Sequence, residues 1–152
     1  FNNYKVKCSI GKRGIKIKKK EGDHITPKGK FKIMSIYYRK DRVPVFRSKI
    51  KKISIKKDMG WCDDPRSKQY NKLIKFPFKY SAEKMYRSDN LYDIVLVLNF
   101  NFKPISNGRG SAIFIHVATK NYKDTEGCIA VNKTDLKKII KKINKKTIVN
   151  IG

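Results

Sequence analysis

The chain has 152 residues, with 38 Lys and Arg against 12 Asp and Glu, which gives a formal net charge of +26. This length suits one domain with a single hydrophobic core. No apolar run approaches the roughly 18 residues that a membrane span needs, so no membrane span is predicted.

The positive charge predicts attraction to polyanions. Lysines are spread along the whole chain, however, and no cluster of arginines with interleaved aromatic residues is present. Such clusters are typical of proteins that read nucleic acids. We therefore expect no specific nucleic-acid binding, and a non-enzymatic polyanion-binding module is the less favoured alternative.

Short strands dominate the predicted structure. Alternating apolar and polar residues or apolar clusters predict strands at residues 4–10, 15–18, 31–38, 48–55 and 147–151. Nearly continuous apolar runs at residues 91–100 and 113–117 are typical of strands buried on both faces. Residues 60–70 carry turn residues and are predicted to be irregular.

The clearest predicted helix covers residues 132–145. Its apolar residues recur with helical spacing, and Asn132 is the expected N-cap. A second, short helix is predicted at residues 81–87, capped by Ser81. The fold class is therefore mainly β with one or two helices, without repeated βαβ units.

Three cysteines are present, Cys8, Cys62 and Cys128, and none has the spacing of a zinc site. We expect no metal. Cys8 alternates with Val6 and Ile10 and is predicted to lie in the core. The odd number of cysteines leaves at least one thiol free.

A histidine and a cysteine mark the chemically interesting part of the chain. His116 ends one apolar run, and Cys128 follows Gly127 and opens another. A thiolate is a strong nucleophile, and a neighbouring histidine can serve as its base. Gly127 frees the backbone to turn, so that N–H groups near Cys128 could face a developing oxyanion. The pattern indicates a cysteine acyl-transfer site, although both side chains could instead be structural.

The motifs around this pair resemble those of the L,D-transpeptidase catalytic domain (YkuD) family. The active-site signature of that family is similar to the series His116, Thr125, Gly127, Cys128 and Asn132. Residues 22–31 (GDHITPKGKF) resemble its early motif, and one branch of the family has motifs like those at residues 60–65 (GWCDDP), 70–71 (YN), 91–93 (LYD) and 108–114 (GRGSAIF). The resemblance implies one catalytic domain over residues 1–152 with a β-sandwich or barrel fold.

The resemblance also implies roles for individual residues. Cys128 matches the nucleophile, His116 the base that later protonates the leaving amine, and Gly127 the oxyanion region. The implied enzyme needs no cofactor and acts on peptidoglycan stem peptides as donor and acceptor. It releases D-alanine, keeps a thioester and passes the acyl group to an amine, which cross-links the cell wall and so affects its organisation and cell shape. With water as acceptor, the same site is an L,D-carboxypeptidase.

Two positions depart from the family pattern. Glu126 stands where a second histidine is commoner, and Ala130 stands where many members have arginine. We suggest Arg109 as a substitute carboxylate anchor, because a guanidinium pairs bidentately with carboxylates.

Further candidates for substrate contacts are Ser111, Thr125, Glu126, Trp61 and Tyr92. The last two, being aromatic, either line a groove or pack in the core. The resemblance implies a location in the periplasm or cell envelope of a bacterium, with a cytoplasmic recycling enzyme as the alternative.

Overall fold

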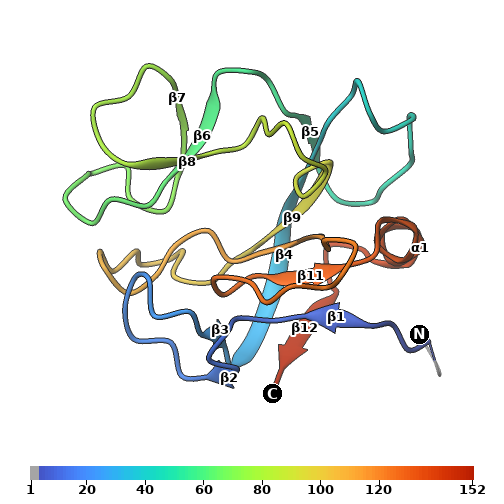
Figure 1. Ribbon diagram of the computed structural model, residues 1–152, viewed down its shortest axis with the longest axis horizontal. Helices are drawn as coiled ribbons and strands as arrows, with labels where there is room; N and C mark the ends of the chain where they lie inside the picture. The colour runs from blue at the N-terminus through green and yellow to red at the C-terminus, as the bar shows by residue number, and fades with distance from the viewer. Residues whose placement is uncertain (1–3) are drawn as a thin grey trace.

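A seven-stranded mixed sheet forms the centre of the molecule in the computed structural model, which describes residues 4–152 (Figure 1). Its strand order is β1-β11-β10-β9-β4-β12, and β5 pairs with β4. The strands are β1 (Cys8–Ser9), β4 (Gly29–Tyr38), β5 (Lys52–Ser54), β9 (Ile94–Leu98), β10 (Phe114–Val117), β11 (Ile129–Val131) and β12 (Ile148–Ile151). Strand β4 joins the two halves of this sheet, because its start pairs with β12 and its end with β9 and β5.

Two smaller sheets flank the main one. In Figure 1 a three-stranded antiparallel sheet lies above it and a two-stranded parallel sheet below it. Their strands are β6 (Met59–Cys62), β7 (Leu73–Lys75), β8 (Ala82–Lys84), β2 (Ile15–Lys16) and β3 (Thr26–Pro27). Within residues 4–152, no helix has the length and apolar character needed to cross a bilayer. The molecule is a mainly β single domain, as predicted.

Strand β9 is buried on both faces, as its apolar sequence predicts. Ile94, Leu96 and Leu98 pack into a core cluster on the side of the helix. Val95 and Val97, which alternate with them, pack into a second cluster beneath the three-stranded sheet. The chain thus has hydrophobic contacts on both sides of its central sheet, because successive side chains of a strand point to opposite faces.

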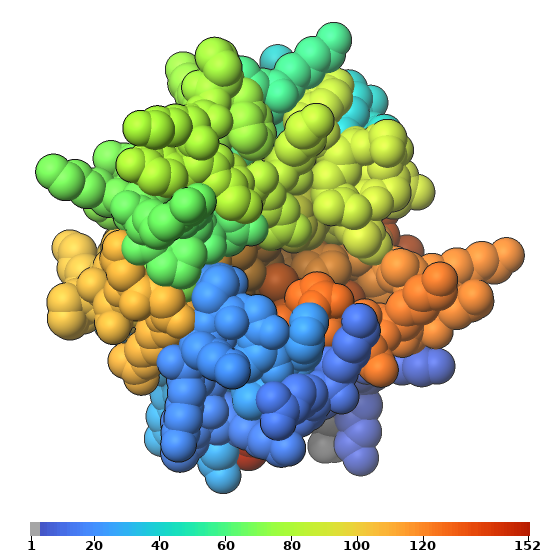
Figure 2. Space-filling view, turned by 60° about the vertical axis from the view of Figure 1, so that its left-hand side comes forward, coloured from blue at the N-terminus to red at the C-terminus, as the bar shows by residue number. Residues whose placement is uncertain are grey.

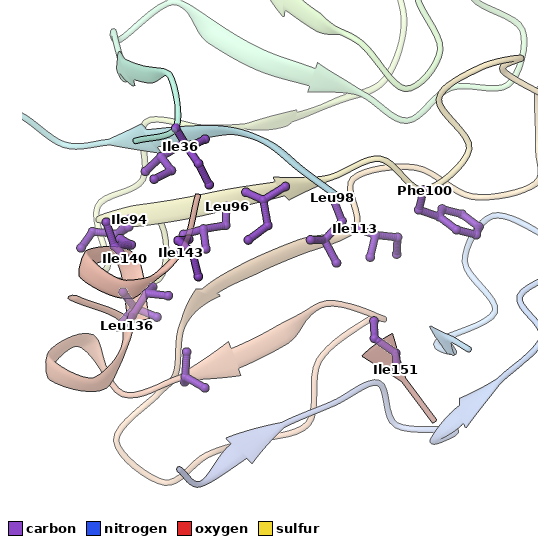
Figure 3. Packing of buried hydrophobic residues seen from close by; sticks show 14 of the residues in the cluster. Ile36, Ile94, Leu96, Leu98, Phe100, Ile113, Leu136, Ile140, Ile143 and Ile151 are labelled. Atoms are coloured by element: carbon purple, nitrogen blue, oxygen red, sulfur yellow. The ribbon is translucent and has the colours of Figure 1, made fainter. Parts of the chain in front are cut away.

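The single helix within the described residues, α1 (Lys133–Lys142), covers the first of these clusters. Asn132 caps it as predicted, since its side chain accepts a hydrogen bond from the Thr134 N–H at 2.8 Å. Figure 3 shows Leu136, Ile140 and Ile143 facing the residues of β9. The helix ends before the predicted residue 145, because Ile143 is extended and the chain turns there into β12.

The predicted short helix at residues 81–87 is wrong. Residues Ala82–Lys84 form β8 and pair antiparallel with β6, and the Met85 N–H continues this pairing by donating to Met59 O at 3.0 Å. Met85 itself is fully buried. The interstrand hydrogen bonds and the burial of Met85 override the local helical preference of this segment, as tertiary contacts commonly do.

Two other predictions need correction. Cys8 is exposed, and its neighbour Ser9 is buried instead, so the alternation at the edge strand β1 has the opposite phase to the predicted one. Residues 60–70, predicted to be irregular, begin with strand β6, whose four residues are all buried. The sequence signal was weak there because the strand is short and runs directly into a turn.

Candidate functional site

The register of two parallel strands brings His116 and Cys128 together. Strands β10 and β11 are neighbours, and His116 is paired with Ala130. Cys128 lies two residues before Ala130, and side chains two apart on an extended chain point to the same face. The imidazole and the thiol therefore project from the same face of the sheet, the face that carries the second hydrophobic cluster.

The thiol of Cys128 lies in a pocket of backbone groups. It donates a hydrogen bond to the carbonyl oxygen of Ala112 at 3.1 Å and accepts one from the N–H of Phe114 at 3.4 Å. Burial, followed by the nearby charge of Glu83, raises the pKa of Cys128 to about 12. Both causes disfavour the thiolate, so Cys128 is a neutral thiol in the resting protein.

The orientation of His116 is fixed by the chain next to it. Its Nδ1 lies 2.9 Å from the carbonyl oxygen of Val117. Because a carbonyl oxygen only accepts hydrogen bonds, Nδ1 carries the proton and Nε2 keeps a free lone pair. Burial lowers the pKa of His116, so the imidazole is neutral and available as a base.

A cavity of about 490 Å³ opens beside this pair. It appears in Figure 2 as a hollow between the segments coloured blue, yellow-green and orange. Pockets of this size commonly hold small molecules or short peptide segments. The cavity brings together most of the predicted site residues: His116, Cys128, Gly127, Ser111, Thr125, Glu126 and Tyr92.

A half-buried carboxylate in this cavity was not predicted from the sequence. Glu83 accepts a hydrogen bond from the hydroxyl of Tyr92, whose ring lies edge-on to His116 with 5.4 Å between the ring centroids. Burial raises the pKa of Glu83 and also that of Tyr92. The sequence pattern predicts a helix for this segment, whereas Glu83 lies on β8 and lines the cavity.

Gly127 occupies a backbone position that other residues would not tolerate. Its φ is +143°, and a Cβ atom there would lie 2.9 Å from the carbonyl oxygen of Ile25. Its N–H donates to Thr125 Oγ1 at 3.1 Å, and the Thr125 hydroxyl donates to Cys128 O at 2.6 Å. Thr125 therefore stabilises the turn that precedes Cys128. The oxyanion role of Gly127 stays a prediction.

The residue before Gly127 is linked to the other histidine of the chain. Glu126 pairs with Lys12 at 3.1 Å and contacts His24 Nδ1. Although burial alone would raise the pKa of Glu126, the hydrogen bond from Lys12 and the charge of His24 lower it overall. The position that is commonly a histidine in the family thus holds a carboxylate with His24 beside it.

Trp61 and Arg109 lie outside the residues that line the cavity. The indole N–H of Trp61 donates to Asn71 Oδ1 at 2.9 Å, and its ring packs against Phe114, so Trp61 is a core residue. Arg109 is exposed, with its guanidinium over the ring of Phe100. The cationic residues that do line the cavity are Lys18, Arg87 and Lys123.

Comparison with known families identifies the chain. The family model for the L,D-transpeptidase catalytic domain (YkuD) matches residues 2–151. The protein belongs to this family, in agreement with its mainly β fold and its histidine–cysteine site. Neither the curated proteins nor the solved structures gave a significant match.

Proposed function

We propose that this protein is a cysteine L,D-transpeptidase that cross-links peptidoglycan stem peptides in the bacterial cell envelope, through an acyl-enzyme on Cys128. The observation that carries the proposal is the placement of a free cysteine and a neutral histidine, whose Nδ1 is held by the Val117 carbonyl, on one face of a sheet beside a cavity of suitable size. Membership of the family supports the substrate class.

The proposed reaction has two halves. The Cys128 sulfur attacks the carbonyl carbon at the L-centre of the donor diamino acid while its proton passes to His116 Nε2. The intermediate collapses, its C–N bond breaks, and the D-alanine amine leaves with that proton. An acceptor amine then attacks the thioester and gives a proton to His116, which returns it to the departing thiolate.

The charges around the cavity support recognition of both a carboxylate and an amine. Arg87 lies over the ring of Tyr92 at 5.2 Å and lines the same cavity as His116 and Ala130, the position where many family members have arginine. We propose Arg87, in place of Arg109, as the anchor for the carboxylate of the donor. Its guanidinium already donates to the Asp89 carboxylate through Nε and Nη2, so the donor carboxylate would bind at the remaining Nη1 edge.

Carboxylates gather in this cavity although the chain as a whole is strongly basic. The chain has 12 Asp and Glu residues in all, and five of them line the cavity: Glu21, Asp63, Glu83, Asp124 and Glu126. Three basic side chains, Lys18, Arg87 and Lys123, line the same cavity, so the acidic side chains are in excess there, and such an excess raises the local concentration of cationic ligands. This favours as acceptor an amine that is cationic in solution and loses a proton to water before it attacks, and thus a transpeptidase over a carboxypeptidase that uses water.

The test uses tetrapeptide stems with and without an acceptor stem, followed by mass spectrometry. We expect D-alanine release and, with the acceptor, cross-linked dimers. Cys128→Ala should abolish both, whereas Cys8→Ala, which changes an exposed cysteine of another strand, should leave them intact. Hydrolysed product without dimers at high acceptor concentration would favour the carboxypeptidase. Full activity of Cys128→Ala would reject the mechanism.

A further inference from the structure

Tyr70 and Asn71 are buried next to each other behind the wall of the cavity, with 1% and 6% of their surfaces exposed. Neither lines the cavity. Asn71 has a φ of +55°, in the left-handed region that asparagine tolerates better than most residues. Its backbone N–H donates to Cys62 O at 2.9 Å, which holds it beside strand β6.

The side-chain amide of Asn71 is saturated with hydrogen bonds. Its oxygen accepts from the indole of Trp61 at 2.9 Å and from the N–H of Ala112 at 3.1 Å. Its nitrogen donates to the carbonyl oxygens of Phe100 at 3.1 Å and Asn101 at 2.8 Å. Four partners of fixed polarity determine which end of the amide faces Ala112.

Tyr70 holds the other end of the same short segment. Its hydroxyl accepts the N–H of Gly110 at 2.9 Å and donates to the carboxylate of Glu21. Residues 110–112 are therefore hydrogen-bonded at both ends by adjacent side chains from another part of the chain.

The conformation of this segment matters for the nucleophile. Ala112 has a φ of +53°, a left-handed conformation that costs a non-glycine residue free energy and persists only where its surroundings enforce it. The hydrogen bond from its N–H to Asn71 is one such constraint. The Ala112 carbonyl oxygen, at the other end of the residue, accepts the Cys128 thiol.

We propose that Tyr70 and Asn71 are positioning residues, which hold residues 110–112 in the conformation that keeps the Ala112 carbonyl on the Cys128 thiol. The consequence for catalysis rests on the proposed function, with Cys128 as the nucleophile. The effect on the reactivity of the Cys128 thiol does not rest on the proposed function, because it concerns the hydrogen bond of Cys128 in the free protein.

The experiment measures the reactivity of Cys128 in Tyr70→Phe and Asn71→Leu. Iodoacetamide labelling of the Cys128 peptide is followed by mass spectrometry from pH 7 to pH 10. Loss of the hydrogen bond that stabilises the neutral thiol should make labelling about tenfold faster at each pH in Asn71→Leu, and a few-fold faster in Tyr70→Phe, since one pKa unit is a tenfold change in thiolate.

In the stem-peptide assay we expect kcat to fall about 100-fold in Asn71→Leu with KM nearly unchanged, since misplacing a reacting group by about 1 Å can cost that much.

The matched control is Asn99→Ala, which removes another structural asparagine whose side chain accepts the Lys32 N–H at 2.8 Å, away from the cavity. It should lower the melting temperature without changing the labelling profile. If Tyr70→Phe and Asn71→Leu are labelled at the same rates as this control, the positioning role is wrong. If Asn71→Leu does not fold, Tyr70→Phe decides alone, and labelling of Tyr70→Phe at the wild-type rate would also reject the role. If the wild type releases no D-alanine while the labelling differences appear, the proposed function fails and the positioning role stands.

Discussion

The thiol of Cys128 donates its hydrogen bond to the carbonyl oxygen of Ala112, at 3.1 Å, in the ligand-free protein. A backbone carbonyl stabilises the protonated thiol and not the thiolate. The thiol is therefore uncharged at rest, and in the proposed mechanism it transfers its proton to His116 during the reaction.

The resting charge state leads to a pH prediction for labelling of Cys128. Burial raises the pKa of Cys128 to about 12 and lowers that of His116, so no thiolate–imidazolium pair forms at neutral pH. Labelling by iodoacetamide should rise about tenfold for each pH unit between 7 and 10, without a plateau. Peptide mass spectrometry gives the rates. A reactive plateau near pH 6–7, as an ion pair would produce, would contradict this assignment.

Glu83 is expected to lower the reactivity of the Cys128 thiol. Its charge is one of the causes that raise the pKa of Cys128, so Glu83→Gln should lower that pKa and increase the thiolate fraction. We expect labelling of Cys128 to be about three- to tenfold faster at pH 9. Glu126→Gln is the control, because Lys12 already pairs with that exposed carboxylate. Equal rates in both variants would show that Glu83 does not act on the thiol.

Arg87 and Arg109 can be separated by substrate kinetics. Arg87→Ala should raise the KM for stem tetrapeptides about tenfold or more, because removal of one member of a charge-assisted pair costs roughly 1.5–3 kcal/mol. Arg109→Ala should leave KM within about twofold, since that side chain lies outside the cavity lining. The opposite pattern would return the anchor to Arg109.

The ion pair between Lys18 and Asp23 is buried and should matter for stability. The two side chains are 2% and 3% exposed, and Asp23 also accepts the N–H of Ile25 at 3.1 Å. Asp23→Asn leaves the Lys18 charge buried without its partner, so we expect a loss of about 3–5 kcal/mol in the free energy of unfolding. Urea denaturation measures it. Glu126→Gln, which breaks a solvent-exposed pair, should cost at most about 1 kcal/mol.

Gly127 is expected to be irreplaceable at its turn. Gly127→Ala forces a methyl group to within 2.9 Å of Ile25 O at a φ of +143°, so it should destabilise the protein and displace Cys128. Gly22→Ala is the comparison, because its φ of +68° is also positive but the added Cβ would meet nothing within 4 Å. That variant should lose only about 1–2 kcal/mol. Thermal unfolding and Cys128 labelling together distinguish the two.

Elements with long periodic patterns were predictable from the sequence. The spacing of Leu136 and Ile140 predicted the helix, and the apolar run around Leu96 predicted the central strand. The three-stranded sheet could not be predicted from the sequence, because its strands have three or four residues and depend on pairing between distant segments. Because residues 81–87 were predicted to be helical, Glu83 was not expected to lie in the cavity.

The candidate pair, His116 and Cys128, was predicted because a cysteine with a histidine indicates acyl transfer and because the motifs around the pair resemble those of the YkuD family. Its surroundings were harder to predict. Arg109 was chosen for its residue type, but only tertiary structure shows that Arg87 lies in the cavity instead. Likewise, no local pattern connects His24 with Glu126, or Asn71 with Ala112, because the contacts join segments far apart in the chain.

The segment that connects β10 and β11 lies outside the strand pairing that positions His116. The pairing of His116 with Ala130 places the imidazole and the Cys128 thiol on one face of the sheet. That segment supplies one wall of the cavity, through Thr119, Lys123 and Asp124 among others. Exchanges at residues 119–124 should therefore change the shape and charge of the cavity while the pairing of β10 with β11 is kept.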